Sequence, residues 1–343
     1  MKYNRVLVIN LKQAGDVLVS SPVIAAVHEA WPGAEVSMLV ARGTEDMVRG
    51  HPGLKRVYAV NRRQGSWRET VRLVRELRRQ RFDLALDLSW GDRGAFLAWA
   101  SGAGERVGFA RQRQPLWQRW GTFTRLVPRP PLKMHMVEQN LEALRALGAT
   151  PGHPRLAFYW DEETERRVKA LLADLGLAGR PYAVVHPGAG WRFKCWTPAG
   201  YARVIEALEE ERGLPVVLTG APGPLDRELV EEILAQCRVR PRVLVGQTSL
   251  MGLGVLIARA RLFFGVDSAP MHLAAAVGTP AAALFGPSGD FNWGPWGDGH
   301  RVIRKGWDCQ PCGRAGCEDT KISRCLTELS PAEVLAALAG WPV

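Results

Sequence analysis

The chain has 343 residues, with 45 lysines and arginines against 34 aspartates and glutamates, a formal net charge of +11. All of this excess lies in residues 1–150, which hold 24 basic and 13 acidic residues, whereas residues 151–343 hold 21 of each. Apolar residues make up 47% and charged residues 23%, which excludes a disordered chain and a coiled coil. The length exceeds what one core usually supports, so we expect two domains.

No stretch of the sequence approaches the ~20 consecutive apolar residues that cross a bilayer. The basic start and its short apolar run are too short for a signal peptide and predict a first strand. We therefore expect a cytoplasmic protein. Its six cysteines fit that compartment better than a disulfide scaffold.

The first half alternates apolar runs with amphipathic stretches. The runs at 5–11, 35–41, 56–60 and 83–88 predict strands, and the stretches at 17–30, 44–50 and 66–80 predict helices. Continuous apolar strands that alternate with helices are typical of a parallel sheet covered on both faces.

The same rhythm returns after residue 180. Strands are predicted at 182–186, 215–220, 243–246, 262–266 and 281–286, and helices at 198–212, 225–237, 249–259 and 269–277. An acidic helix at 161–175 separates the halves, and Ser330-Pro331 opens a last helix. We predict an α/β fold of two doubly wound, Rossmann-like domains that face a central cleft. The expected boundaries are 1–160, 161–328 and, for the C-terminal helix, 329–343.

The first strand leads into Gly15-Asp16 just before a predicted helix. A dinucleotide fingerprint needs three glycines here and only Gly15 is present, which argues against a nicotinamide-dependent dehydrogenase. Asp16 is then a carboxylate at the edge of the expected cleft, on a turn that glycine permits. A helix N-cap is the structural alternative, because aspartate is favoured at that position.

Glycines and a lysine follow the strand at 182–186. The segment His186-Pro187-Gly188-Ala189-Gly190 lets backbone N–H groups approach an anion, and Lys194 can add a charge to a phosphate. A plain structural loop with an incidental lysine is the alternative.

The strand at 262–266 ends in Asp267-Ser268, and Pro270 opens the next helix with His272 in its first turn. N–H groups of residues 268–270 and the positive end of the helix dipole suit a pyrophosphate. A capping role for Ser268 and a packed imidazole for His272 are the structural alternatives.

Four motifs occur in this order: Gly15-Asp16-Val17 with Pro22, His186-Pro187-Gly188 with Lys194-x-Trp196, Gly265-Val266-Asp267-Ser268-x-x-x-His272, and Leu284-Phe285-Gly286-Pro287. Together they resemble glycosyltransferase family 9, the ADP-heptose:lipopolysaccharide heptosyltransferases, over essentially the whole chain. The cysteine-containing tail looks most like the heptosyltransferase III branch. The resemblance implies a GT-B fold, with the acceptor on the N-terminal domain and the sugar nucleotide on the C-terminal one.

The resemblance also implies a reaction and its residues. Heptose would move with inversion from ADP-L-glycero-D-manno-heptose to an inner-core heptose of lipopolysaccharide, with Asp16 as general base and Lys194 on the phosphates. The implied donor-binding residues are His186, Gly188, Thr248, Asp267, Ser268, Ala269 and His272. The chain departs from many relatives by having Ser-Ala-Pro at 268–270. Arginines in loops of the basic half are candidate acceptor contacts: Arg62, Arg63, Arg111 and Arg113.

No metal is expected to be required for catalysis. Lys194 and a helix end can stabilise the departing ADP, and Asp87 with Asp92 is a poor match to a metal-binding D-x-D pair. A structural zinc or iron is a separate hypothesis, with a reduced or partly disulfide-linked loop as the alternative. Its ligands would be Cys309, Cys312, Cys317 and Cys325.

The expected partners are ADP-heptose and a lipopolysaccharide inner core at the cytoplasmic face of the membrane, with the protein peripheral to the inner membrane. Protein O-heptosylation and a GT-B-like sugar-nucleotide epimerase are alternative activities. A nucleic-acid-binding role for the basic half is disfavoured, because no recognised motif accompanies the charge.

Overall fold

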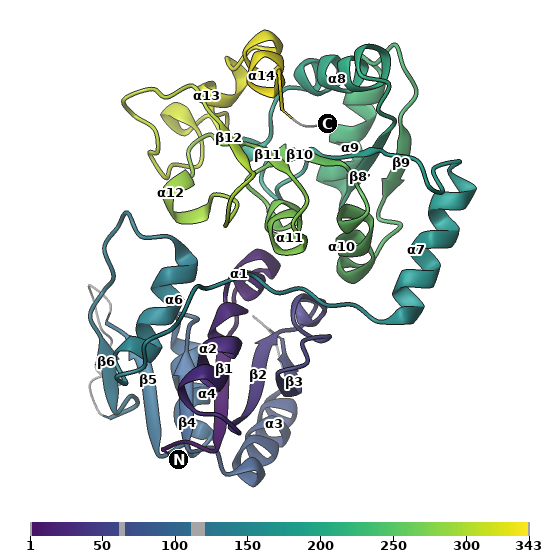
Figure 1. Cartoon of the computed structure of the whole chain (residues 1–343). Coiled ribbons are helices and arrows are strands. Elements are labelled where there is room, and N and C mark those ends of the chain that lie inside the picture. Colours follow the sequence, from purple (N-terminus) through teal and green to yellow (C-terminus); the bar gives the residue numbers. More distant parts are fainter. Residues whose placement is uncertain (1, 62–65, 111–120, 342–343) are drawn as a thin grey trace. The chain divides into compact units, whose positions relative to one another are not determined.

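The computed structural model describes residues 2–61, 66–110 and 121–341. The chain divides into two compact units, Met1–Tyr159 and Trp160–Val343. Each unit is a parallel sheet with helices on both faces (Figure 1). The predicted α/β fold with two doubly wound sheets is confirmed.

The first unit is built on a six-stranded sheet in the order β3-β2-β1-β4-β5-β6. Helices α3 and α4 cover one face, and α2 and α6 pack together on the other. The strands are β1 (Arg5–Asn10), β2 (Glu35–Ala41), β3 (Leu54–Val60), β4 (Leu84–Asp87), β5 (Glu105–Phe109) and β6 (Arg125–Val127). The helices are α1 (Ala14–Val19), α2 (Pro22–Ala30), α3 (Trp67–Gln80), α4 (Asp92–Ala100) and α6 (Met136–Arg145).

β1 is a continuous apolar run because both of its faces are buried. Val6, Leu7, Val8 and Ile9 are all fully buried. Because successive side chains of a strand point to opposite faces, this pattern requires a sheet covered on both sides.

Two predicted helices of this unit differ from the structure. The stretch at 17–30 is two helices, α1 and α2, because the Ser20 hydroxyl donates to the Val17 carbonyl (2.7 Å) and Pro22 opens a new helix. The stretch at 44–50 forms only a single 3-10 turn, Glu45–Met47.

The second unit has the same topology, in the order β12-β11-β10-β7-β8-β9. Helices α8, α9 and α14 cover one face, while α7, α10 and α11 pack together. The strands are β7 (Ala183–His186), β8 (Val216–Gly220), β9 (Arg242–Val245), β10 (Leu262–Val266), β11 (Ala281–Leu284) and β12 (Arg301–Ile303). The helices are α7 (Glu162–Asp174), α8 (Pro198–Glu206), α9 (Pro224–Leu234), α10 (Leu250–Ala258), α11 (Ala269–Val277), α12 (Asp290–Trp293), α13 (Arg324–Thr327) and α14 (Pro331–Leu338).

Both sheets reverse their strand order next to the first strand of the unit. β1 lies between β2 and β4, and β7 lies between β8 and β10. Ligands of open parallel sheets bind beyond the carboxyl ends of the strands at such a point. Ligand-binding and catalytic side chains are therefore expected in the loops after β1, β4, β7 and β10.

No helix among the described residues is both long and apolar enough to cross a membrane.

The close contact of β10 with β7 generates a stability prediction. A Cβ added at Gly265 would lie 2.6 Å from the His186 carbonyl oxygen, so Gly265→Ala must push two paired strands apart. We expect it to lower the free energy of unfolding by about 1–3 kcal/mol in urea titrations.

Gly252→Ala is the matched control within the same unit. Its new Cβ would lie 3.5 Å from the Ser249 hydroxyl, an ordinary contact, and alanine is the better helix former, by about 1 kcal/mol. Equal stability of the two variants would contradict the steric argument.

Candidate functional site

Asp16 lies at the carboxyl edge of the first sheet, in the first turn of α1. The N-cap of this helix is Gln13, and Gly15 is a helical residue without a positive φ. Both sequence interpretations of the backbone at Asp16, the glycine-permitted turn and the N-cap, are therefore wrong. A carboxylate in the first turn is still favoured by the helix dipole.

The cation of Lys12 lies near Asp16. The Lys12 ammonium lies 3.8 Å from the Asp16 carboxylate, and the two side chains are 23% and 18% exposed. Burial lowers the pKa of Lys12, whereas the nearby Asp16 and Asp87 carboxylates act in the opposite direction. Lys12 favours an ionised Asp16, because an opposite charge at this range stabilises the charged form.

Asp87, the last residue of β4, completes a buried group of charges with Lys12. Burial raises its pKa to about 6, although the Ser89 amide donates to its carboxylate (2.9 Å) and Lys12 opposes the shift. The carboxylate also lies against Gly94, where an added Cβ would meet it at 2.3 Å. Asp87 therefore holds its proton at a pH where an ordinary aspartate is ionised.

Asn10 and Trp90 also belong to this edge, and neither was among the residues predicted from the sequence. The buried Asn10 amide donates to the Asp16 carbonyl (3.0 Å) and to the Ser20 hydroxyl (3.2 Å), which fixes α1 on β1. Trp90 adopts φ +60°, stacks on Phe109 at 4.6 Å and lies 5.8 Å from the Lys12 ammonium. A polar residue at the end of a buried strand was the available signal for Asn10.

In the second unit, the residues brought together are Lys194 and Asp267. Lys194 ends the 3-10 turn Arg192–Lys194 after β7, and Asp267 follows β10. The ammonium donates to the carboxylate at 2.7 Å, with side-chain exposures of 27% and 10%. Two motifs 73 residues apart thus meet at the point where the strand order reverses.

The helix α11 begins beside this ion pair. Ser268 is its N-cap residue, but the hydroxyl donates to the Val266 carbonyl (3.2 Å) and does not cap the helix. Pro270 has no N–H, and the Met271 N–H bonds to the Ser268 carbonyl (3.1 Å). The expectation of donors throughout 268–270 is therefore wrong at Pro270, and Ser268 and Ala269 are the two residues of that stretch that carry an N–H.

The side chain of His186 is enclosed within the unit. The Thr219 hydroxyl donates to the Val185 carbonyl (3.2 Å), so it accepts from Nδ1 of His186 at 3.0 Å. Burial lowers the pKa of His186 to about 4, which keeps the ring neutral, although Asp226 acts in the opposite direction. Any contact of His186 with the sugar nucleotide would therefore have to come from its backbone.

Asp226 also gives Gly188 a structural reason to be glycine. An added Cβ at Gly188 would lie 2.3 Å from the Asp226 carboxylate, which accepts from the Ala221 amide at 2.7 Å. The carboxylate thereby holds the loop after β8 on α9, and Gly188 lets the loop after β7 pack closely against it.

The other residues predicted to bind the sugar nucleotide are distributed along this edge of the sheet. His272 is buried in α11 and faces the edge of Trp293, with ring centroids 6.3 Å apart. Thr248 is half-buried after the edge strand β9. Trp196, of the Lys194-x-Trp196 motif, is a core residue whose indole donates to the Leu329 carbonyl (2.8 Å).

The four arginines predicted to contact the acceptor, Arg62, Arg63, Arg111 and Arg113, lie outside the described residues. Their role stays a prediction.

The four cysteines of the tail are free thiols in the structure. Burial, with the neighbouring Cys317, Cys312 and Cys309, raises the pKa of the Cys325 thiol to about 11. Among the described side chains, no group of three or more histidines, cysteines or carboxylates is arranged to hold a metal ion. The structural zinc or iron stays a prediction.

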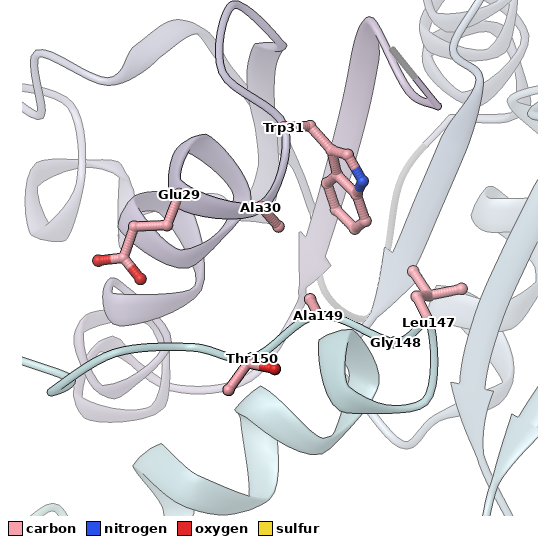
Figure 2. A pocket seen from close by; sticks show the side chains of 7 residues that line it. All are labelled: Glu29, Ala30, Trp31, Leu147, Gly148, Ala149 and Thr150. Atoms are coloured by element: carbon pink, nitrogen blue, oxygen red, sulfur yellow. The ribbon is translucent and has the colours of Figure 1, made fainter.

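A hollow of about 270 Å³ in the first unit is separate from these strand ends (Figure 2). It lies where α2 ends at Ala30 and Trp31, and α2 runs from the carboxyl end of β1 back to the start of β2. The hollow is therefore at the opposite edge of the sheet. Its polar side chains are those of Glu29 and Thr150, and Glu29 already accepts from the Gly152 amide at 3.0 Å.

Comparison with known proteins gives a consistent result. Residues 70–323 match the family model of glycosyltransferase family 9 (heptosyltransferase). The chain is 33% identical over 293 residues to lipopolysaccharide heptosyltransferase 3 of Escherichia coli K12, and the match covers 83% of each chain.

Two solved structures share the fold over nearly the whole chain. A glycosyl transferase of family 9 from Veillonella parvula superimposes with a TM-score of 0.84 at 22% identity, covering 98% of this chain and 97% of that one. The ADP-heptose lipopolysaccharide heptosyltransferase II of E. coli does so with a TM-score of 0.75 at 25% identity, covering 97% of both chains.

The buried Asp87 generates a pH prediction. Because its pKa is raised from 3.8 to about 6, the folded protein holds a proton that the unfolded chain has released between these values. The contribution of Asp87 to stability is therefore full below the lower value and is lost as the pH rises through the upper one.

Asp87→Asn should remove this loss. From about pH 4 to about pH 6, the free energy of unfolding of the variant minus that of the wild type should rise by on the order of 2 kcal/mol in urea titrations. A flat difference for Asp87→Asn would show that its carboxyl is not perturbed.

Proposed function

The chain belongs to glycosyltransferase family 9, the heptosyltransferases, and from this premise we propose that it transfers heptose from ADP-L-glycero-D-manno-heptose to an inner-core heptose of lipopolysaccharide. The observation that carries the proposal is the 33% identity to a lipopolysaccharide heptosyltransferase 3 over 83% of both chains. The proposed reaction is a single displacement with inversion at the anomeric carbon.

The Lys194–Asp267 pair supports a donor site at the second sheet. As the bond from the anomeric carbon to the β-phosphate oxygen breaks, its electron pair leaves with ADP, and negative charge grows on the diphosphate. An ammonium has three N–H donors, and Asp267 accepts one of them at 2.7 Å. Lys194 is thus oriented by Asp267 and retains donors for the phosphate oxygens.

The start of α11 adds a second source of positive potential. The N–H groups of Ser268 and Ala269 and the dipole of this nine-residue helix can stabilise an anion beside Lys194. With these groups on the diphosphate, we propose that the reaction does not require a divalent metal. His272 and Thr248 would line the rest of the nucleotide-sugar site.

Asp16 is the proposed general base on the acceptor side. It would take the proton of the acceptor hydroxyl while the new C–O bond forms, and for this it must be ionised. The Lys12 ammonium at 3.8 Å supports that state. The acceptor is held in a membrane, so we propose that the protein works at the cytoplasmic face of the inner membrane.

Incubation with ADP-heptose and a truncated lipopolysaccharide core, with mass detection of the products, tests the proposal. The expected product is a core heavier by one heptose, formed from ADP-heptose and not from UDP- or GDP-sugars. Conversion of the donor without an acceptor would instead indicate an epimerase. Heptose found on protein and not on the core would indicate protein O-heptosylation.

Asp16→Asn should abolish most heptose transfer while it leaves binding of the ADP-heptose donor intact. We expect kcat to fall by about 10²–10⁴, the usual contribution of a general base, with ADP-heptose binding within about twofold of wild type. Calorimetric titration of the donor and initial-rate kinetics measure the two quantities. Asp46→Asn is the matched control and should keep its rate, whereas near-normal turnover of Asp16→Asn would remove Asp16 from the mechanism.

Lys194→Gln should impair the use of the ADP-heptose donor. Loss of a charged hydrogen bond to phosphate corresponds to about a 10- to 100-fold change, and the substitution also leaves Asp267 unpaired. We therefore expect kcat/KM for ADP-heptose to fall by that factor, with the acceptor KM little changed.

Lys169→Gln serves as the control for Lys194→Gln, because Lys169 is an exposed lysine that pairs with Glu165 at 3.3 Å. Its kinetics should match those of the wild type. Equal effects of Lys194→Gln on both substrates would count against a phosphate role.

A further inference from the structure

Helix α3 of the first unit carries a stripe of arginines that the proposed reaction does not use. Arg68, Arg72, Arg75 and Arg79 are all exposed, and their spacing of four, three and four residues places them along one side of the helix. Leu73 and Leu77 are buried on the opposite side, in the core of the unit. At 1.5 Å per residue the stripe is about 16 Å long.

The arginines of this stripe have no acidic partners within the described part of the chain. The side chains of Arg72, Arg75 and Arg79 make no ion pair or hydrogen bond there, and the Arg68 guanidinium lies over the Trp67 ring at 5.7 Å. The two acidic residues of α3 are engaged elsewhere. Glu76 pairs with Arg56 from β3 at 2.9 Å, and Glu69 accepts from the Asn61 amide at 3.3 Å.

Helix α7 shows how the same chain treats basic residues on another exposed helix. There Glu163 pairs with Arg166 and Arg167 at 2.8 Å each, and Glu165 pairs with Lys169 at 3.3 Å. These contacts at three- and four-residue spacings stabilise a helix in water. The exposed face of α7 is therefore balanced in charge, and the α3 stripe is not.

The stripe contains three like-charge pairs at three- and four-residue spacings: Arg68–Arg72, Arg72–Arg75 and Arg75–Arg79. Each such pair destabilises a helix by about 0.2–0.5 kcal/mol, which Glu69 and Glu76, at the same spacings from Arg72, offset only in part because both have other partners. An anionic surface laid along the stripe would relieve this repulsion. The charge pattern of α3 is thus complementary to a partner with closely spaced negative groups.

Trp67 indicates which anionic partner fits. It is the first residue of α3 and is 70% exposed, although a large apolar ring is costly to leave in water. Tryptophan beside arginines is typical of helices that lie in the headgroup region of a bilayer, where the ring is partly apolar and the guanidinium groups reach phosphates. A nucleic-acid duplex would match the charge, but its bases are already paired and stacked and offer Trp67 no apolar phase.

We propose that the arginine stripe of α3, with Trp67, docks the first unit on the surface of an anionic phospholipid bilayer. The stripe lines a surface groove of about 660 Å³ with Arg56 and Glu76, which gives headgroups a concave seat. The proposal rests on the proposed function, because an acceptor held in a membrane requires the enzyme to reach a lipid surface. Positive charge near an anionic leaflet contributes about 1 kcal/mol per arginine.

Vesicle co-sedimentation of the full chain, without sugar donor, tests this docking. Wild type should bind vesicles of equal parts phosphatidylcholine and phosphatidylglycerol at low salt, and should bind pure phosphatidylcholine vesicles weakly. Arg72→Gln/Arg75→Gln/Arg79→Gln should lower the partition coefficient on anionic vesicles on the order of a hundredfold. Trp67→Ala should weaken binding by a factor that high salt does not remove.

The matched control is Arg180→Gln/Arg240→Gln/Arg314→Gln. These three exposed arginines of the second unit also make no ion pair within the described part, so the control lowers the net charge equally. It should bind anionic vesicles like the wild type. The triple variant of α3 should unfold at about the wild-type urea concentration, because the three exposed side chains make no ion pair in the described part of the chain. This separates docking from misfolding.

Equal binding of the α3 variant and the wild type to anionic vesicles would overturn the proposal, as would an equal loss in the control. Tighter binding of the wild type to duplex DNA at the same salt, lost in the α3 variant, would assign the stripe to nucleic acid instead.

Transfer assays separate this proposal from the proposed function. The α3 variant should glycosylate a lipid-free core fragment at the wild-type rate and a vesicle-embedded acceptor more slowly. Absence of transfer to every acceptor would reject the proposed function and leave the vesicle result standing.

Discussion

Burial of both sheets on both faces is the constraint on which the rest of this structure depends. The four apolar side chains Val6 to Ile9 of β1 are fully enclosed, so no chemistry can lie along the strand. Polar side chains appear where the strands end, and there they are still largely out of water. Asp87 at the end of β4 and His186 at the end of β7 both favour the neutral form, because burial disfavours charge.

The two sheet edges handle buried charge in different ways. At the first edge the Lys12 ammonium lies near both Asp16 and Asp87, so one cation interacts with two carboxyl groups. At the second edge Lys194 and Asp267 form a direct pair at 2.7 Å. In the proposed reaction these arrangements have matching tasks, since one edge must accept a proton and the other must stabilise a leaving diphosphate.

The uneven charge of the chain has a structural counterpart. In the second unit, Glu206 of α8 pairs with Arg203 at 3.5 Å and with Arg238 at 2.9 Å, and Glu163 of α7 pairs with Arg166 and Arg167. In the first unit, α3 leaves a row of arginines without acids. Part of the +11 excess is therefore one continuous feature on one helix face and not a diffuse surplus, which is why it points to an extended anionic surface.

Sequence periodicity by itself determined the two parallel sheets, because a strand enclosed on both faces must be continuously apolar and its covering helices must be amphipathic. The motifs also located Lys194 and Asp267, since glycines and polar residues directly after apolar strands have few structural reasons to be there. The sequence could not reveal that Asp16 sits inside α1, that Ser268 leaves its helix uncapped, or that His186 is turned into the core. Only the tertiary structure decided these points, and it alone brought Lys12 to Asp87 and Lys194 to Asp267. The physical reason is that periodicity reports which face of an element is buried, whereas contacts between distant strand ends depend on strand order, which leaves no periodic trace in the chain.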